Sequence, residues 1–566
     1  MKHVWKRAIG LLLGVSMMAS LAACTPSGGG TTTPPASSPS TPSSTTPATT
    51  PATADKLIYS NGGPEEFFET PWLNPGTYMY TKTLYAHLIV ADENLNPIPD
   101  HADALAKYDY SADGMTLIFT LRDDAFWHDG EKITPADIKW SIEYVAKTAV
   151  CNPVFLSTFK AIAGSTKADG SISDTFSGIV IDGQKITITF DKIAPDALLT
   201  FTQFAPAPQK YFDGVDPLQV QQAAYFQKPI GSGPFMIEDV QMKNYTILKP
   251  FDKYYNGVAD FKIQLQPSAG DSDANLATRV KSGQLDYGYT KMISDVQAIT
   301  GTPGVDITSI DVRYTRLFFL NKFPKANGTP APLGDERVRQ AVRYAIDMST
   351  ICETLFEGAA VPADVLIPGA ADKASGLNSY DYNPEKAKEL LAEANWNPNT
   401  VLKVVYYYTD QTTVDLMTAI QAYLAEAGIK MEFNLVQGDL AAILWTAPAD
   451  QKNGPSAVDW DMAYAANAAL SLHEYYDRYR TGSATNSHTP EDAELNALID
   501  ATNASTNVDE QIAAFKKLSE YENENMFTMA LYYQPIFLIT SNKIGDIKKA
   551  TPQFNYDWDI QHWNVG

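Results

Sequence analysis

Short stretches of the chain alternate between hydrophobic and polar residues, which is the pattern of half-buried β-strands. Residues 115–122 place three apolar side chains on one face of such a strand, namely Leu117, Phe119 and Leu121. Residues 179–190 hold two more apolar runs around Asp182-Gly183, a dipeptide that tolerates the positive φ of a tight turn. These patterns predict a strand followed by a β-hairpin.

Elsewhere, apolar residues recur at helical spacing directly after residues that cap helices. Thr134-Pro135-Ala136-Asp137 combines an N-cap, a first-turn proline and a capping-box acid, and apolar residues of helical period follow it. Asp335 and Asn383 precede two further stripes of this kind. We therefore predict helices that begin after Thr134, Asp335 and Asn383.

A strand, a helix and a second strand follow one another between residues 402 and 436. Leu402–Tyr408 and Ile429–Val436 have strand character, and Thr412–Ala427 has the period of a helix that Gly428 closes. Two strands joined by a helix lie parallel in one sheet. The pattern thus predicts an α/β fold with a partly parallel sheet.

Residues 1–23 have the organisation of a secretory signal peptide. A basic head precedes the apolar segment Ala8–Ala19, which is too short to span a bilayer. Leu21-Ala22-Ala23-Cys24 resembles the bacterial lipobox, in which the cysteine receives a diacylglyceryl group. We expect Cys24 to be the first mature residue and the membrane anchor. An ordinary signal peptide with an incidental cysteine is the alternative.

The residues from Cys24 to Ala54 are expected to form a lipidated, disordered linker. Positions 25–54 are almost wholly Thr, Pro, Ser, Ala and Gly, with no aromatic residue to seed a core. Such a tether has a root-mean-square reach of roughly 30 Å. The globular part is therefore expected to be extracytoplasmic and mobile near a membrane.

Residues 55–566 exceed the size of a single-core domain and predict two or three lobes. The net charge of −23 opposes binding to polyanions, so nucleic acid is not an expected partner. No run of eighteen apolar residues follows the leader, so no later segment is expected to span a membrane. Cys151 and Cys352 are too few for a disulfide framework and are expected to be buried thiols.

The mature sequence carries no catalytic or metal-binding signature. Gly231-Ser232-Gly233 lacks the glycine spacing of a nucleophile elbow or a phosphate loop. His128 is expected to be structural, and His473 lacks the second histidine of a zinc helix. We expect no enzyme activity, no metal site and no cofactor. Two carboxylates that meet in a cleft, as in a glycosidase, are the enzymatic alternative.

Six segments, in order across residues 56–545, resemble the landmarks of one protein family. They are Ile98–Val145, Pro229–Phe235 (PIGSGPF), Ser282–Gly288 (SGQLDYG), Leu317–Lys322 (LFFLNK), Asp335–Asp347 (DERVRQAVRYAID) and Tyr382–Trp396. On these segments the chain resembles family 5 of the extracellular solute-binding proteins, which serve oligopeptide, dipeptide and nickel ABC importers.

The resemblance implies an α/β, bilobal periplasmic-binding-protein-like fold of type II, cluster C, with an extra subdomain in the first lobe. The expected parts are lobe I (residues 55–96, 229–312 and 541–566), its extra subdomain (97–228) and lobe II (313–540). Chain crossings near Phe319–Lys322 and Ile539–Asn542 would form the hinge. Ligand would close the lobes by hinge bending, and the closed form would dock on a permease.

For the ligand, the resemblance is less specific. Peptide-binding members commonly place an aspartate after a Trp-X-X motif to pair with the α-ammonium group of a peptide. The corresponding segment here is Tyr464-Ala465-Ala466-Asn467, in which a neutral asparagine replaces the carboxylate, although Asp459 and Asp461 lie close by. The charge-assisted part of that contact is then lost. Sugars, blocked peptides and other neutral solutes stay open as ligands.

Aromatic clusters are the second indication of a ligand site, because aromatic faces stack on sugars and peptide groups. Three clusters lie where family clefts draw contacts, and we expect at least two of them to line the interlobe cleft. The candidate ligand-binding residues are Trp72, Tyr78, Tyr80, Trp460, Tyr464, Asn467, Tyr532 and Tyr533. Core packing is the alternative role for such rings.

The sequence as a whole predicts a lipid-anchored, extracytoplasmic, monomeric receptor that passes peptides or a similar mid-sized solute to an ABC permease. The alternatives are the same scaffold with an oligosaccharide or another non-peptide solute, or a sensor, adhesin or chaperone without a transport partner.

Overall fold

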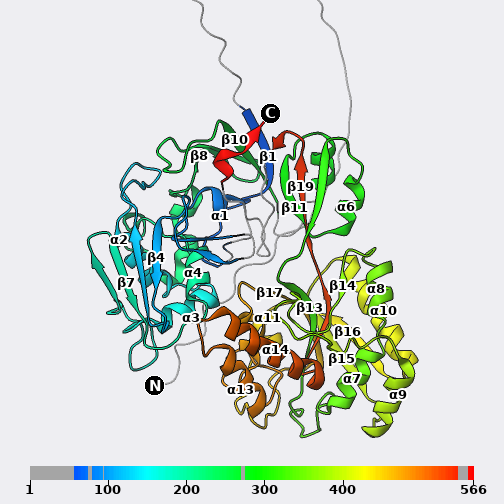
Figure 1. The fold of residues 1–566 in the computed structure, drawn as a ribbon. Coiled ribbons are helices and arrows are strands. Elements are labelled where there is room, and N and C mark those ends of the chain that lie inside the picture. Colours follow the sequence, from blue (N-terminus) through cyan, green and yellow to red (C-terminus); the bar gives the residue numbers. More distant parts are fainter. Residues whose placement is uncertain (1–55, 74, 76–78, 93–94, 269–274, 546–558) are drawn as a thin grey trace, which may run out of the picture. The chain divides into compact units, whose positions relative to one another are not determined.

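The computed structural model describes residues 56–73, 75, 79–92, 95–268, 275–545 and 559–566. The predicted signal peptide, Cys24, the linker and Tyr78 lie outside the described residues. Asp55–Gly566 form one compact unit, whose ribbon is shown in Figure 1.

A seven-stranded sheet gathers strands from three separate parts of the chain. Its order is β12 (Val305–Ile310), β19 (Ile536–Ser541), β11 (Tyr287–Thr290), β1 (Lys56–Gly63), β10 (Phe261–Pro267), β9 (Tyr245–Pro250) and β8 (Phe235–Gln241). β1 runs parallel to β10 and β11, and β19 lies antiparallel between β11 and β12. Buried Ile58, Ile263 and Leu538 share one core. We call this part lobe I.

The remaining elements of lobe I are short. They are α1 (Met79–Thr83), α5 (Leu276–Lys281), α6 (Ile293–Ile299), the strand pair β20 (Ile544–Gly545) and β21 (Asn564–Val565), and the 3₁₀ turn η5 (Ile560–His562).

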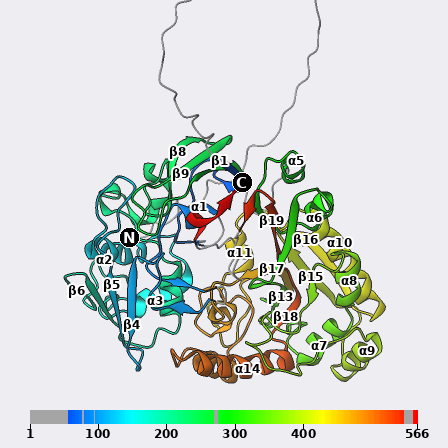
Figure 2. The same ribbon diagram turned by 45° about the horizontal axis from the view of Figure 1, so that its top comes forward.

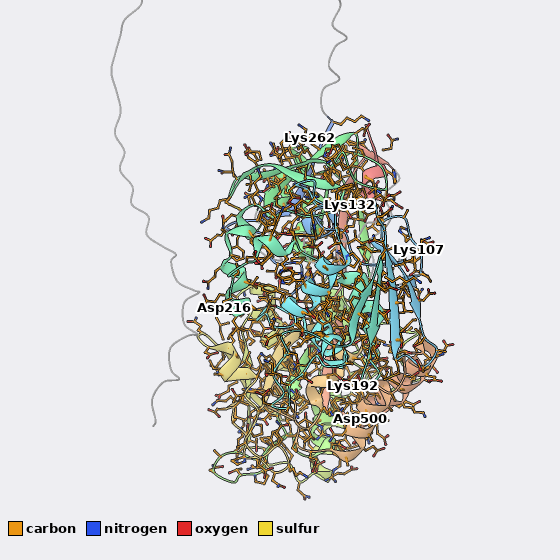
Figure 3. The ribbon with its side chains drawn as sticks, turned by 90° about the vertical axis from the view of Figure 1, so that its left-hand side faces the viewer. Lys107, Lys132, Lys192, Asp216, Lys262 and Asp500 are labelled. Atoms are coloured by element: carbon orange, nitrogen blue, oxygen red, sulfur yellow. The ribbon has the colours of Figure 1, made fainter. Side chains whose placement is uncertain are left out.

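A smaller unit, the extra subdomain, is inserted into the sequence of lobe I between β1 and β8 and has a four-stranded sheet. Its order is β4 (Ala106–Tyr110), β5 (Thr116–Leu121), β7 (Lys185–Thr189) and β6 (Ile179–Asp182). Around it lie α2 (Pro135–Val145), α3 (Pro153–Ala161), α4 (Ala197–Gln203), the pair β2 (Val90–Ala91) and β3 (Pro97–Ile98), and the 3₁₀ turns η1 (Gln209–Tyr211), η2 (Pro217–Gln222) and η3 (Ala224–Gln227). In Figure 3, Lys107 marks β4, and Asp500 marks a helix of the second lobe.

Several sequence predictions are confirmed in this subdomain. Leu117, Phe119 and Leu121 are buried together on one face of β5. Gly183 has φ +59° in the turn of the β6–β7 hairpin. Thr134 and Asp137 form the predicted reciprocal capping box at the start of α2.

The second lobe, lobe II, has a six-stranded sheet. Helices lie on both faces of this sheet (Figures 1 and 2). Its order is β14 (Val361–Pro362), β18 (Thr528–Tyr533), β13 (Tyr314–Leu320), β17 (Met462–Ala468), β15 (Val401–Tyr406) and β16 (Lys430–Leu435). One face packs against α7 (Glu336–Tyr344), α8 (Met348–Thr354), α9 (Pro384–Glu393) and α10 (Gln411–Glu426). The other packs against α11 (Leu440–Leu444), α12 (His473–Tyr476), α13 (Ala493–Thr502) and α14 (Val508–Asn525), with the turn η4 (Asp477–Tyr479) after α12.

The residues of β13 show why lobe II is layered on both sides. Phe318 and Leu320 belong to the core under α7–α10, whereas Leu317 and Phe319 belong to the core under α11–α14. A central strand that is apolar on both faces needs cover on both sides. The predicted parallel unit is confirmed here, because β15 and β16 pair in parallel and α10 joins them.

The chain crosses between the two large sheets at residues 311–313, between β12 and β13, and at Gln534–Pro535, between β18 and β19. Both crossings differ from the hinge that we predicted. Phe319 lies inside β13, and Ile539 pairs with Gly288 and Ile307 inside the sheet of lobe I. The sequence was misleading because both hinge segments continue directly into long apolar strands.

His128 ties the extra subdomain to lobe I. Its Nδ1 accepts from the backbone N–H of Gly231 (3.1 Å), and its Nε2 donates to the carbonyl of Gly233 (3.0 Å). Burial lowers the pKa of His128 to about 4, so the ring is neutral and holds one proton, on Nε2. The structural role predicted for His128 agrees with these contacts.

The same segment leaves no room for a side chain. A Cβ on Gly231 would lie 1.8 Å from the carbonyl oxygen of Leu84. That oxygen accepts hydrogen bonds from the N–H groups of Ser232 (2.9 Å) and Gly233 (2.8 Å), so it is not free to move away.

We expect Gly231→Ala to lower the free energy of unfolding by about 2–3 kcal/mol, because overpacking must displace backbone that is hydrogen-bonded. Urea denaturation checks this. Gly545→Ala is the matched control, since the nearest atom to its Cβ is 3.7 Å away, and it should change stability by less than about 0.5 kcal/mol. Equal stability of the two variants would contradict the prediction.

Candidate functional site

A cavity of about 890 Å³ lies beside the two chain crossings. Lobe I contributes Ser309 and Phe537, the crossings contribute Arg313 and Gln534, and lobe II contributes residues between Gly358 and Lys373. Sites for small molecules typically enclose about 300–1,000 Å³ and often lie between domains. The cavity therefore has the size and the position of a ligand site.

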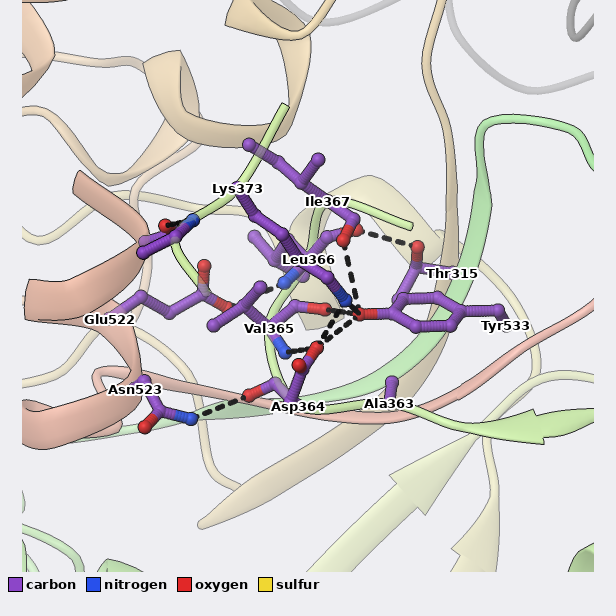
Figure 4. Close-up of polar contacts among 12 residues, drawn as sticks. Thr315, Ala363, Asp364, Val365, Leu366, Ile367, Lys373, Glu522, Asn523 and Tyr533 are labelled. Atoms are coloured by element: carbon purple, nitrogen blue, oxygen red, sulfur yellow. Dashed lines mark hydrogen bonds and ion pairs between the residues drawn. The ribbon is translucent and has the colours of Figure 1, made fainter. Parts of the chain in front are cut away.

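Part of the lobe II wall of this cavity belongs to the segment Ala363–Ala374, which has neither helix nor strand. Tyr533, the last residue of β18, holds it in place (Figure 4). The Tyr533 hydroxyl lies 2.7 Å from Asp364 Oδ1, 2.8 Å from the carbonyl of Val365 and 3.1 Å from that of Ile367. One hydroxyl has one proton, and the shortest contact assigns it to Asp364.

Asp364 and Lys373 form an ion pair at the same place. Lys373 Nζ lies 2.6 Å from Asp364 Oδ1, and it also donates to the Tyr533 hydroxyl at 3.0 Å. Burial raises the pKa of Asp364, but the hydrogen bonds from Lys373 and Tyr533 lower it by more. The net shift of this pKa is therefore downward. The carboxylate is thus ionised and compensated within the wall.

A second set of side chains holds the wall from behind (Figure 4). Glu522 of α14 accepts from the N–H of Leu366 (2.8 Å), and the neighbouring Asn523 donates to the carbonyl of Asp364 (3.2 Å). Thr315 of β13 donates to the carbonyl of Leu366 (2.7 Å). Backbone groups outside regular structure need such partners when they are buried, so the wall is a preorganised surface.

The cavity presents charges of both signs. Arg313 donates from Nη1 to the carbonyl of Leu470 (3.0 Å), and no acidic side chain among the described residues lies within ion-pair distance of it. Asp311 and Asp372 also line the cavity. A solute bound here meets a cation and carboxylates near the hinge.

The extra subdomain, which His128 joins to lobe I, also contacts lobe II. His473 Nδ1 lies 3.0 Å from Asp196 Oδ1, and His473 Nε2 lies 3.0 Å from the carbonyl of Thr502. Burial lowers the pKa of His473, but Asp196 raises it more, to about 9, so the ring is doubly protonated at neutral pH. Both ring nitrogens are donors and neither is available to a metal. A cavity of about 240 Å³ adjoins this pair.

The predicted aromatic residues are mostly core residues. Trp72 packs on Phe212 and Phe226 and donates to the carbonyl of Ala205, and Tyr80 packs edge-on against Phe68. Both are 1% exposed, so neither offers a ring face to a solute in this conformation. Tyr78 lies outside the described residues.

The lobe II candidates include both core residues and one residue of the cavity. Trp460 and Tyr464 are 1% exposed; the first donates to the carbonyl of Ile443, and the second shares a hydrogen bond with the Tyr532 hydroxyl. Asn467 is half-buried in β17, opposite Thr315. Among the described candidates, Tyr533 lines the cavity of about 890 Å³ and the others do not. Direct contact of any of them with ligand stays a prediction.

Sequence reasoning missed the wall segment and its partners. Residues 363–374 have no periodicity, and Glu522 and Asn523 are 150 or so positions away in a helix whose polar residues resemble a solvated face. The turn formers Pro368-Gly369 between two predicted elements were the one available signal.

The described residues contain no group of three or more His, Cys, Asp or Glu side chains placed to hold a metal ion. Cys151 and Cys352 are free and buried, which confirms the predicted pair of thiols. None of the helices in the described ranges has both the length and the apolarity needed to cross a membrane.

We expect Lys373→Met to lower the free energy of unfolding by about 1–2 kcal/mol, because it removes the cation that pairs with the partly buried Asp364 carboxylate. Chemical denaturation measures the loss. Lys388→Met removes an exposed lysine paired with Glu385 and should cost less than about 0.5 kcal/mol.

The double variant Asp364→Asn/Lys373→Met should regain most of this loss, because no charge is then left unpaired. A double variant as unstable as Lys373→Met would show that the lysine contributes by packing and not by charge.

Glu522 gives the stability of the protein a pH dependence. Burial raises its pKa from 4.5 to about 8, against the hydrogen bonds from Tyr476 and Leu366. The folded chain then holds a proton that the unfolded chain has released, so stability falls as pH rises from 4.5 to about 8 and levels off above that.

We expect Glu522→Gln to remove this slope, because the amide oxygen still accepts from Leu366 and nothing titrates. Melting temperatures across that pH range should show the wild type losing stability relative to the variant. Glu520→Gln, at an exposed position of the same helix, is the control and should run parallel to the wild type. Parallel profiles for Glu522→Gln would contradict the assignment.

Comparisons with known proteins agree with this architecture. Residues 99–488 match the family model for bacterial extracellular solute-binding proteins, family 5. A candidate ABC transporter peptide-binding protein of Brucella ovis is 25% identical over 365 residues, which are 64% of this chain and 64% of the relative, less than two thirds of its length. The oligopeptide-binding protein OppA of Lactococcus lactis subsp. cremoris is 23% identical over 463 residues, 75% of this chain and 76% of OppA.

Among solved structures, the ABC transporter substrate-binding protein CtaP of Listeria monocytogenes superposes with a TM-score of 0.72 at 19% identity, covering 90% of this chain and 100% of CtaP. This likeness confirms the predicted α/β, bilobal, type II binding-protein fold. The matched family consists of solute-binding proteins and not of enzymes, as predicted. Because its model covers more than half of the sequence, the chain belongs to family 5 of the bacterial extracellular solute-binding proteins.

Proposed function

We propose that this protein is the extracytoplasmic substrate-binding lipoprotein of an ABC importer, and that it captures peptides or a similar mid-sized solute between its lobes for delivery to a permease. The observation that carries the proposal is the cavity of about 890 Å³ that both chain crossings border. A ligand held there contacts both lobes and both crossings. It therefore favours one interlobe angle over others, as closure by ligand requires.

The charges at the cavity support a peptide more than a neutral sugar. A peptide carries an ammonium group and a carboxylate, and Arg313 and the acids Asp311 and Asp372 offer partners for both. The relatives from Brucella and Lactococcus have peptide-binding and oligopeptide-binding names, which agree with this choice. Tyr533 is the predicted aromatic residue best placed to contact the ligand.

The anchor completes the proposal. Residues 1–23 are removed as a signal peptide, Cys24 carries the lipid, and the linker up to Ala54 lets a monomeric receptor reach its permease while it stays on the membrane. Lobe I then consists of residues 55–96, 229–310 and 536–566, with the end of its second segment and the start of its third both moved to the crossings, and residues 97–228 form the extra subdomain.

Thermal-shift screening of the full chain against peptides and oligosaccharides tests the proposal. A ligand at 100 times its Kd stabilises the folded state by about 2.7 kcal/mol. We expect peptides to raise the melting temperature and neutral oligosaccharides to leave it unchanged. Stabilisation by oligosaccharides alone would transfer the proposal to a sugar receptor.

Ala370→Trp supplies the matched control for the site. Ala370 is exposed on the cavity wall, so the indole would occupy the cavity without entering a core, and peptide stabilisation should disappear. Ala392→Trp, on the exposed face of α9, should leave it intact. Full peptide response from Ala370→Trp would place the ligand elsewhere.

A further inference from the structure

Arg316 is a charged residue enclosed by tyrosines. It projects from β13 into a cage in which its guanidinium carbon lies 4.3 Å from the ring centre of Tyr408, 5.2 Å from that of Tyr314 and 5.8 Å from that of Tyr464. Cation–π contacts of this kind are attractive and strengthen where the cation is desolvated. The cage stabilises the cation without neutralising it.

The hydrogen bonds of Arg316 are incomplete. Within the described residues its guanidinium makes one, from Nε to the side-chain oxygen of Gln534 at 3.0 Å. Its Nη1 atom is buried and has no partner. No acidic side chain among the described residues forms an ion pair with it, although the residue as a whole keeps some solvent exposure.

The surrounding hydroxyls do not supply the missing negative charge. Burial raises the pKa of Tyr408, Tyr464 and Tyr532, so all of them are neutral at physiological pH. Tyr464 and Tyr532 are hydrogen-bonded to each other, and Tyr408 to Tyr407. Arg339, a buried arginine elsewhere in this lobe, has more hydrogen-bond partners than Arg316. Its guanidinium donates to the carbonyls of Leu333, Gly334, Asn525 and Met526.

Gln534 connects the cage to the ligand cavity. It lines the cavity of about 890 Å³ and also a small one of about 20 Å³, which Tyr532 and Lys291 share. It belongs to the second chain crossing, and its side-chain nitrogen donates to the carbonyl of Lys291 (3.1 Å). The Gln534 oxygen thus bonds the Arg316 guanidinium at a position that a carboxylate oxygen would also suit. Gln534 also lines the cavity of about 890 Å³, from which a carboxylate would approach.

We propose that Arg316 is the anion-binding residue of a carboxylate subsite, in which an incoming carboxylate pairs with Nη1 between the tyrosine rings and Gln534. A charge-assisted hydrogen bond to a desolvated guanidinium contributes about 1.5–3 kcal/mol, or at least about 10-fold in affinity. The inference rests on the proposed function only for the source of the carboxylate, which is the C-terminus of a peptide or a free organic acid.

Acetate is the probe that tests the subsite. We expect acetate, at constant ionic strength, to cause a saturable change in the near-UV tyrosine circular dichroism of the full chain, and acetamide, its neutral isostere, to cause none. Arg316→Gln should weaken the acetate response at least about 10-fold. Arg480→Gln, which removes an exposed arginine paired with Asp500, should keep it.

Substitutions of Gln534 test the same idea with Arg316 intact. Gln534→Glu supplies a carboxylate next to the guanidinium and should suppress the acetate response at least about 10-fold, whereas Gln534→Ala should retain it. The proposal is overturned if acetate acts like acetamide on the wild type, or if Gln534→Glu responds like Gln534→Ala.

A peptide arm separates this inference from the proposed function. Trialanine should bind at least about 10-fold more tightly than its C-terminal amide if the peptide carboxylate occupies the subsite. Equal binding of both peptides with no acetate response would refute the Arg316 subsite and leave the peptide receptor standing. An acetate response without binding of either peptide would support the subsite for an organic acid and refute the peptide receptor.

Discussion

The wall of the cavity of about 890 Å³ depends on the hydroxyl of Tyr533. The wall segment from Ala363 to Ala374 has neither helix nor strand; Ala363 pairs by its N–H with the carbonyl of Leu531, and several other polar backbone groups rely on side chains from elements on either side. Tyr533 ends the strand that leads to the second crossing, and Glu522 and Asn523 approach from α14. The shape of the wall is therefore determined by residues far from it in the sequence.

Lobe II buries charge in three distinct ways. Asp364 has a lysine and a tyrosine as partners and stays ionised. Arg339 and Arg343 direct their donors to backbone carbonyls, and burial lowers the pKa of each to about 10. Arg316 has aromatic faces and a single amide oxygen. An unpaired buried charge costs several kcal/mol. Arg316 differs from Asp364, Arg339 and Arg343 because its Nη1 atom has no hydrogen-bond partner.

Local signals in the sequence were sufficient for most of the fold. The capping box at Thr134, the caps at Asp335 and Asn383, the hairpin at Gly183 and the parallel unit that contains α10 all follow from contacts within a few residues or from one period of hydrophobicity. The crossing at Gln534–Pro535 did not follow, because apolar strands flank it on both sides.

The candidate site was less predictable from the sequence than the fold. Aromatic rings favour both cores and ligand sites, and the sequence does not distinguish them: Trp72 and Trp460 fill cores, whereas Tyr533 borders the cavity. What separates them is tertiary burial. The wall segment, Glu522 and Arg316 carry no periodic or motif signal, and their importance arises from long-range contacts that only the folded chain contains.

The bonds of His128 to Gly231 and Gly233 also have a consequence for how the extra subdomain would move when the lobes close. They join the extra subdomain to lobe I through a neutral ring and through glycines that admit no side chain. We expect the two to move together, so that a rotation at the crossings would carry the subdomain along with lobe I. Asp196 of the subdomain pairs with His473 of lobe II, so the same rotation would strain or break that ion pair and make it part of the energetics of closure.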